Sequence, residues 1–125
     1  MTDLATPETT NELLDTYFAM WREPDDSARA ALVVRAFTAD GRHVDPMADA
    51  NGHLELNQMV SNVHAQYPGC TVERTTEIDQ HGDQLRFGWK VTQADGTVLV
   101  EGLDVAELAE DGRLRRVAGF WGPLA

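Results

Sequence analysis

The spacing of apolar residues changes once along this chain of 125 residues, and that change constrains the fold more than any other feature. Before Pro68-Gly69, apolar residues recur every three or four positions, which is typical of amphipathic helices. After it, apolar and polar residues alternate, which is typical of strands. Helices that precede a run of consecutive strands predict an α+β fold, with the helices packed against a sheet. The whole chain, residues 1–125, is expected to form one domain.

Three helices are expected before the change. The first should begin at Thr6-Pro7-Glu8, with Thr6 as the N-cap and Pro7 in the first turn. Its apolar stripe comprises Leu13, Leu14, Tyr17, Phe18 and Trp21. After a break at "EPDD", the stripe of the second helix comprises Ala28, Leu32, Val33, Ala36 and Phe37, and "TADG" ends that helix. The third stripe comprises Leu56, Met59, Val60, Val63 and Tyr67, before the stop at Pro68-Gly69.

Five strands are expected. The first is short and ends in "RHVDP", residues 42–46, because a proline removes a backbone donor; "PMADANG" then forms a loop. Four more strands lie at residues 70–79, 84–93, 97–108 and 113–122, and they are joined by turns at "QHGD", "ADG" and "AEDG". Consecutive strands with short turns predict a mainly antiparallel sheet.

The register of the last three strands decides what surrounds Asp104. Two-residue turns at Asp95-Gly96 and Asp111-Gly112 would pair Asp104 with Phe87 on one side and with Gly119 on the other. The face around Asp104 would then comprise Phe87, Trp89, Val91, Val100, Gly102, Val117, Gly119 and Trp121. Three-residue loops with a bulge are the alternative, and they would shift the register by one residue and reverse the faces.

A single acid on an apolar face has two interpretations. Desolvation disfavours the charged carboxylate, so the pKa of Asp104 should rise, and a protonated acid can donate a catalytic hydrogen bond. Alternatively, Asp104 is a buried structural residue that is bonded to a backbone amide or an arginine.

Composition excludes several classes of partner. The formal net charge of −11 disfavours nucleic acid and anionic membranes, both of which need a basic surface. No apolar run approaches the roughly 20 residues of a membrane span, and no signal peptide is expected from the N-terminal residues. Cys70 is the single cysteine, which precludes an internal disulfide. A cytoplasmic protein is expected.

Five segments carry a family resemblance: "TYFAMW", "FTADGRHVDP", "NGH", "YPG" and "EGLDVAELAEDGRLRRVAGFWG". Together they resemble the SnoaL-like branch of the NTF2-like superfamily. The resemblance implies a cystatin-like cone, in which three N-terminal helices pack on a curved mixed, mainly antiparallel sheet around an apolar pocket. It also implies a homodimer through the outer face of the sheet. That face should carry Leu99, Leu103, Val105 and Phe120, which no expected helix covers.

Ketosteroid isomerases of this superfamily resemble the chain at Tyr17, Asp45 and Asp104. The resemblance implies that Asp45 moves a proton, while Tyr17 and a neutral Asp104 stabilise an enolate; a carboxylic acid kept neutral in this enzyme is a standard example. SnoaL-type polyketide cyclases resemble the chain at Asp104, where the acid serves an intramolecular aldol closure. From the residues alone, Tyr17 could equally be a core residue and Asp45 could simply open a turn.

A hydrophobic ligand, such as a flat polycyclic one, would suit the expected pocket, and no cofactor is expected. The expected lining comprises Phe87, Trp89, Trp121, Met20, Met47, Met59, His64, Gly102 and Gly119. No metal site is expected, because no two histidines have ligand spacing beside a third ligand. His43 shares a face with Asp45 and could tune the pKa of that acid or assist proton transfer, but the preferred interpretation is an exposed strand histidine without a part in the chemistry.

Three functions stay open at this point. The first is an enzyme, an isomerase or a cyclase, that works by proton transfer next to a carbonyl. The second is a non-catalytic protein that binds a hydrophobic metabolite. The third is an epoxide hydrolase, which would need an arginine beside its acids; the expected register turns Arg86 away from Asp104. An interaction adaptor fits less well, because it would not need two acids in an apolar cup.

Overall fold

The computed structural model of the chain describes residues 9–122 and has the expected α+β architecture. Its elements are α1 (Thr10–Arg22), α2 (Asp26–Ala36), β1 (Phe37–Asp45), β2 (Ala48–Asn51), α3 (His53–Gln66), β3 (Thr71–Arg74), β4 (Asp79–His81), β5 (Gln84–Thr92), β6 (Val98–Leu108) and β7 (Leu114–Trp121). The strands form one sheet in the order β2-β1-β7-β6-β5-β3, with β4 paired to β5. Only the β1–β7 pair is parallel among the described strands, so the sheet is mixed.

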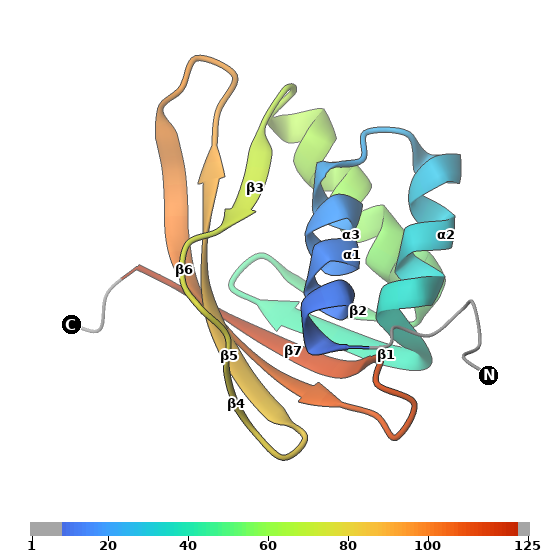
Figure 1. Cartoon of the computed structure of the whole chain (residues 1–125). Helices are drawn as coiled ribbons and strands as arrows, with labels where there is room; N and C mark the ends of the chain where they lie inside the picture. Colours follow the sequence, from blue (N-terminus) through green and yellow to red (C-terminus); the bar gives the residue numbers. More distant parts are fainter. Residues whose placement is uncertain (1–8, 123–125) are drawn as a thin grey trace.

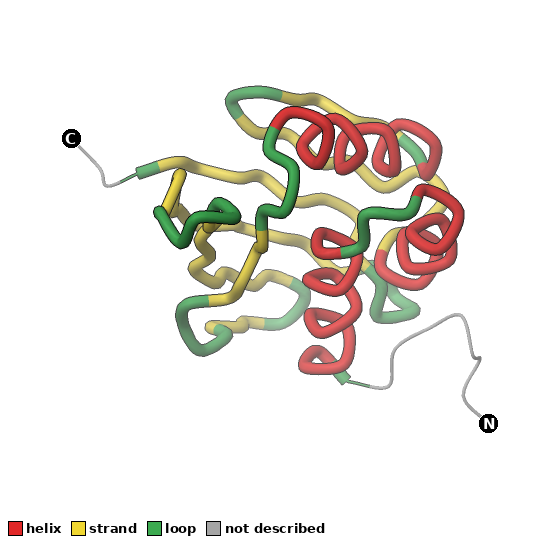
Figure 2. Tube along the Cα trace, turned by 90° about the horizontal axis from the view of Figure 1, so that it is seen from above, coloured by secondary structure: helices red, strands yellow, loops and turns green. Residues whose placement is uncertain are grey.

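The helices lie together on one side of a strongly bent sheet (Figure 1). Viewed from above, α2 lies at one end of the group, beside both other helices (Figure 2). Since α2 packs against α1 and α3 while these two contact each other little, α1 and α3 stand apart over the inner face of the sheet.

Side-chain caps fix where the first two helices begin. Thr9 accepts a hydrogen bond from Glu12 N at 3.1 Å and starts α1 at Thr10. The expected cap at Thr6 and the proline at position 7 lie outside the described residues. Asp25 accepts a hydrogen bond from Ala28 N at 2.8 Å and starts α2 after the expected break. Both starts therefore satisfy amides that the first turn of a helix leaves without partners.

Three sequence predictions for strands are wrong. "TADG" does not end α2 as a turn, because β1 begins directly at Phe37 and pairs in parallel with β7. The expected loop at residues 46–52 contains β2, which forms a tight hairpin with β1 that pairs Asp45 with Ala48. The expected strand at residues 70–79 is two strands, β3 and β4, which pair with different parts of β5.

The register around Asp104 is confirmed, although both turns differ from the prediction. Asp104 pairs with Phe87 and with Gly119. The β5–β6 loop has three residues, 94–96, because Gln93 N bonds to Thr97 O. Val98 pairs with Thr92 and Val100 pairs with Val91, so Leu99 is an extra residue of β6 without a partner on β5. This bulge restores the expected register.

The β6–β7 hairpin repeats this design. Ala109 N bonds to Arg113 O around a three-residue loop, and the register then shifts by one between Glu107 and Leu108. In both hairpins the offset of the loop and the offset of the bulge cancel, so the faces of the strands are the expected ones.

None of the described helices covers the outer face of the sheet (Figure 1), and apolar side chains are exposed there. Phe120 is 58% exposed and Val105 is 38% exposed, with Leu103 beside them on β6. Leu99 differs from the prediction, because the bulge turns it to the mouth of a cavity on the inner side. None of the described helices has the length and apolar character that a membrane crossing requires.

Candidate active site

A cavity of about 480 Å³ lies between α1, α3 and the inner face of the sheet. All three expected catalytic residues line it: Tyr17 from α1, Asp45 from the end of β1 and Asp104 from the middle of β6. Four of the expected pocket residues also line it, namely Met47, Met59, Trp89 and Trp121. The structure therefore brings the three candidate residues and part of the expected apolar wall together in one cavity.

Asp104 lies at the bottom of this cavity and is only 4% exposed. Its Oδ2 accepts a hydrogen bond of 2.8 Å from the hydroxyl of Tyr17. Burial raises the pKa of Asp104 to about 6, against the opposing effects of His43 and the Tyr17 hydrogen bond. Burial, together with the nearby Asp104 charge, also raises the pKa of Tyr17 well above its usual value, so the phenol remains a donor. Asp104 can therefore take up a proton close to neutral pH.

Asp45 has the opposite shift. Burial alone would raise the pKa of Asp45, but hydrogen bonds from the side chain of His43 and the backbone of Met47 outweigh it and lower the pKa. The bond to His43 Nε2 is 2.9 Å long, and the bond from Met47 N is 2.8 Å long. The second bond is part of the turn between β1 and β2. Asp45 therefore opens this turn, as the alternative interpretation expected, and lines the cavity as well. Asp45 is thus a carboxylate over most of the pH range.

Gly119 on β7 makes room for both acids. A Cβ atom there would lie 3.0 Å from Asp104 Oδ1 and 3.2 Å from Asp45 Cβ. The two carboxyl side chains therefore meet over this glycine, and any larger residue would separate them. Two acids with opposite pKa shifts in one small volume can act as base and proton donor.

Five of the expected pocket residues are not among those that line the cavity: Gly119, which lies beneath the two acids, and Phe87, Met20, His64 and Gly102. Phe87 packs edge-on against Tyr17, with a ring distance of 5.9 Å, and so supports the site from below. Met20 is fully buried in the core. His64 Nε2 donates to the backbone oxygen of Trp21 at 2.8 Å and joins α3 to α1. At Gly102 a Cβ would collide with the backbone oxygen of Phe120, so this glycine permits the close approach of β6 and β7.

The cavity also has lining residues that the sequence analysis did not assign to it. His43 is 2% exposed, which corrects its interpretation as an exposed strand residue. Trp21 and Val72 line the wall, whereas Asn62 and Gln66 form a polar edge on α3. Gln66 follows both Asn62 and the predicted stripe residue Val63 by about one helical turn, so this spacing could have indicated a shared face.

The lining contains two carboxyl groups and no lysine or arginine among the described residues. The arginine that an epoxide hydrolase would need is therefore not found here, and Arg86 instead binds Asp79 at 2.7 Å. The indole N–H of Trp89 is near enough to favour the charged form of Asp104, but it has no acceptor at hydrogen-bond geometry. It is thus a buried donor that a ligand oxygen could satisfy.

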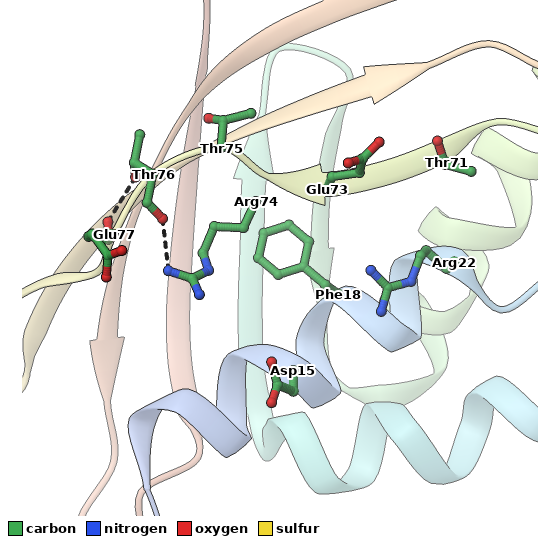
Figure 3. Close-up of a pocket in the computed structure, with 9 residues that line it drawn as sticks. All are labelled: Asp15, Phe18, Arg22, Thr71, Glu73, Arg74, Thr75, Thr76 and Glu77. Atoms are coloured by element: carbon green, nitrogen blue, oxygen red, sulfur yellow. Dashed lines mark hydrogen bonds between the residues drawn. The ribbon is translucent and has the colours of Figure 1, made fainter. Parts of the chain in front are cut away.

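A second hollow, of about 820 Å³, lies between α1 and β3 (Figure 3). Apart from Phe18, every lining side chain is exposed, and Arg74 is bonded to the backbone oxygen of Thr76 at 2.8 Å. Since this open hollow has no buried ionisable group, the acid-lined cavity is the better candidate. In the described part of the chain, no three His, Cys, Asp or Glu side chains are grouped so that they could hold a metal ion.

Comparison with known proteins gives structural matches only. No family model matches the chain, and no curated protein matches it. A SnoaL-like family protein from Agrobacterium tumefaciens strain C58, proposed to be an isomerase, is similar over 89% of this chain and 95% of its own, with 32% identity and a TM-score of 0.83.

Two more distant structures share the fold. A proposed polyketide cyclase from Sinorhizobium meliloti is 18% identical over 86% of this chain and 92% of its own, with a TM-score of 0.68. A protein with a ketosteroid isomerase-like fold from Catenulispora acidiphila, in complex with trimethylamine, is 18% identical over 91% of this chain and 88% of its own, with a TM-score of 0.73.

Proposed function

The chain belongs to the SnoaL-like family, and we propose that it is an enzyme that moves a proton next to a substrate carbonyl. The observation that carries this proposal is the pair of acids over Gly119, one with a lowered pKa and one with a pKa raised to about 6. Structural relatives proposed to be an isomerase and a polyketide cyclase agree with this class of reaction.

In the proposed reaction, the Asp45 carboxylate removes a proton from the carbon next to the carbonyl. The electron pair of that C–H bond moves toward the carbonyl oxygen, which becomes an enolate. Protonated Asp104 donates a hydrogen bond to this oxygen from Oδ1, while Tyr17 holds Oδ2 at 2.8 Å. Return of the proton to another carbon completes an isomerisation. Attack of the enolate carbon on a second carbonyl, whose oxygen takes the proton from Asp45, completes an aldol closure.

The lining also limits the substrate. A neutral molecule fits best, because the cavity offers an anion no cationic side chain among the described residues. The aromatic walls of Trp21, Trp89 and Trp121 favour a flat apolar ring system. We therefore propose a neutral cyclic carbonyl compound as the substrate class.

The test follows the absorbance of the conjugated enone formed from a β,γ-unsaturated ketosteroid. Asp45→Asn should lower kcat/KM by about 10²–10⁴, and Asp104→Ala by about 10²–10³. Asp49→Asn is the matched control, since Asp49 is an exposed carboxylate on the neighbouring strand that binds Arg42 outside the cavity. Equal rates in all variants would contradict the proposal.

A non-catalytic binding protein is the second candidate, because the cavity is walled mainly by aromatic and aliphatic side chains. Saturable binding of neutral ring compounds, without turnover of any ketone tested and without an effect of Asp45→Asn on affinity, would favour this function over the enzyme.

We also propose that the outer sheet face pairs with a second copy of the chain, since Phe120 and Val105 are exposed there beside Leu103. Light scattering should give the dimer mass for the parent and the monomer mass for Phe120→Asp. A monomeric parent would contradict this proposal.

A further inference from the structure

His43 is a buried ionisable residue of the cavity that the proposed reaction does not use. It lies on β1 two residues before Asp45 and is 2% exposed. The indole of Trp21 packs edge-on against its ring at a centroid distance of 5.6 Å. A histidine so placed has lost its hydration and needs hydrogen bonds within the protein.

The hydrogen bond of His43 defines which ring nitrogen faces Asp45. Its Nε2 lies 2.9 Å from Asp45 Oδ2, and a carboxylate oxygen can only accept, so Nε2 carries the hydrogen. Nδ1 is buried and has no hydrogen-bond partner. Nε2 is therefore the nitrogen through which His43 acts on its surroundings.

This bond completes a two-point clamp on Asp45. Oδ2 is held by His43 and Oδ1 by Met47 N at 2.8 Å, so both oxygens of the carboxylate have a fixed donor. The donor at Met47 is a backbone N–H of the turn and does not depend on the side chain at position 47, whereas the donor at position 43 depends on the histidine side chain. Two donors fix the plane of a carboxylate, whereas one leaves it free to rotate.

The charged and titratable groups around His43 are few. Asp45 comes from its own strand, Asp104 from β6 and Tyr17 from α1. The cavity residues of α3 near the mouth, Asn62 and Gln66, carry no charge, and Gly119 of β7 has no side chain. His43 is thus the single basic side chain among the described residues of the cavity lining, and it faces both acids.

We propose that His43 is a positioning residue that holds Asp45 as an oriented carboxylate and so makes Asp45 the base and Asp104 the proton donor. The histidine donates a hydrogen bond through Nε2 and does not itself take the substrate proton, because Nε2 is bonded to Asp45 and Nδ1 is buried. The assignment of base and donor rests on the proposed function, but the effect on Asp45 can be measured without any substrate.

The experiment is a titration of the aspartate side-chain carboxyl carbons by NMR in the parent and in three variants. His43→Phe retains a ring against Trp21 but removes the donor, so the pKa of Asp45 should rise above its usual value of about 3.9. His43→Gln retains an N–H donor and should bring the pKa of Asp45 part of the way back. His53→Gln is the matched control, since His53 also donates through Nε2 but to the backbone oxygen of Phe37, and neither residue lines the cavity; it should leave Asp45 unchanged.

Two results would overturn the proposal. The first is a folded His43→Phe protein in which the pKa of Asp45 is unchanged. The second needs no variant: ¹⁵N shifts of the parent that show no hydrogen on Nε2 at pH 7 would exclude the donor to Asp45.

Turnover separates this proposal from the proposed function. If the parent is an enzyme, His43→Phe should move the acidic limb of its kcat/KM profile upward with the pKa of Asp45, and His43→Gln should move it less. If no ketone is turned over but the carboxyl titration gives the expected shifts, the proposed function fails and the role of His43 in holding Asp45 stands.

Discussion

The inner face of the sheet is packed at one end and hollow at the other. At the packed end, the cross-strand row of Leu85, Ala106 and Val117 is buried and belongs to the core beneath α1. Two rows further along the strands, Trp89, Gly102 and Trp121 also lie side by side, but Trp121 is 41% exposed and the row borders the cavity. The same strands therefore supply the core with one row and the cavity wall with another.

The row between these two contains Phe87, Asp104 and Gly119. Its position explains the behaviour of Asp104, because the packed end removes water from the carboxyl while the hollow end leaves it accessible to a ligand. The raised pKa thus follows from a place at the boundary of the core. It also implies that the site destabilises the fold at the pH values at which Asp104 is charged.

The largest effect is expected at the packed end. Leu85→Ala should lower the free energy of unfolding by about 2–5 kcal/mol, because it leaves a void in the buried core. Val100→Ala at the hollow end should lower it by less than about 1 kcal/mol, because Val100 is only partly buried against the cavity. Urea denaturation of both variants checks the comparison. Similar losses at the two positions would mean that the hollow end is packed as tightly as the core.

The next largest effect is a gain in stability, which is expected for a substitution of Asp104 and depends on pH. The pKa of Asp104 is about 6 in the folded chain and about 3.9 in an unfolded one, so protonation stabilises the fold below pH 4 and this stabilisation is lost as the pH rises through 6. Asp104→Asn cannot ionise. The stability of this variant relative to the parent, measured as the free energy of unfolding, should therefore be higher at pH 8 than at pH 4, by up to about 3 kcal/mol.

Asp45→Asn serves as the control with reversed sign. The lowered pKa of Asp45 stabilises the fold above pH 4, and this stabilisation is lost as the pH falls through the folded pKa. Compared with the parent, this variant should be less stable at pH 8, and the difference should shrink at lower pH. Denaturation curves at pH 4 and pH 8 give the stability of each variant relative to the parent. If the change from pH 4 to pH 8 shifted this difference in the same direction for both variants, the two acids would not occupy different environments.

The two glycines of these rows should respond differently to alanine. At Gly102 the new Cβ would meet the backbone oxygen of Phe120, and a backbone atom can only yield if the strands separate. We expect a loss of about 1–3 kcal/mol in unfolding free energy. At Gly119 the nearest atom is a side-chain oxygen of Asp104 at 3.0 Å, which can rotate. Here we expect a smaller stability loss but a perturbed titration of Asp104, which NMR would detect; an unchanged titration would contradict the contact.

The sequence analysis placed Asp104 correctly because strand alternation and cross-strand pairing are local rules. Its assumption of two-residue turns was wrong at both hairpins, yet the register is as predicted. A three-residue loop is followed each time by a bulge of one residue, and Leu99 shows what this compensation changes: it borders the cavity instead of the outer face. Bulges depend on how a strand bends within the sheet, which alternation alone does not contain.

Other errors arose where burial depends on distant parts of the chain. Pattern alone put His43 and Asp45 on the same side of β1, but which side is buried depends on the parallel pairing of β1 with β7, where His43 lies opposite Val117. β2 was missed because the sequence "ADAN" contains no β-branched or aromatic residue, so that its pairing with β1 alone defines it as a strand. His64 lies near the expected stripe of α3 but is bonded to the end of α1.

The smallest effect concerns the rim of the hollow end. Met47 is 69% exposed and lines the cavity, whereas Leu54 is 89% exposed at the start of α3 and does not line it. Alanine at either position should change the unfolding free energy by less than about 0.5 kcal/mol. Only Met47→Ala should weaken the binding of 2-naphthol, a neutral fluorescent ring compound, by several-fold, which corresponds to about 1 kcal/mol of lost apolar contact. Equal affinities for the two variants would mean that ligands of this size stay below the rim, and that the hollow end binds them through the aromatic walls alone.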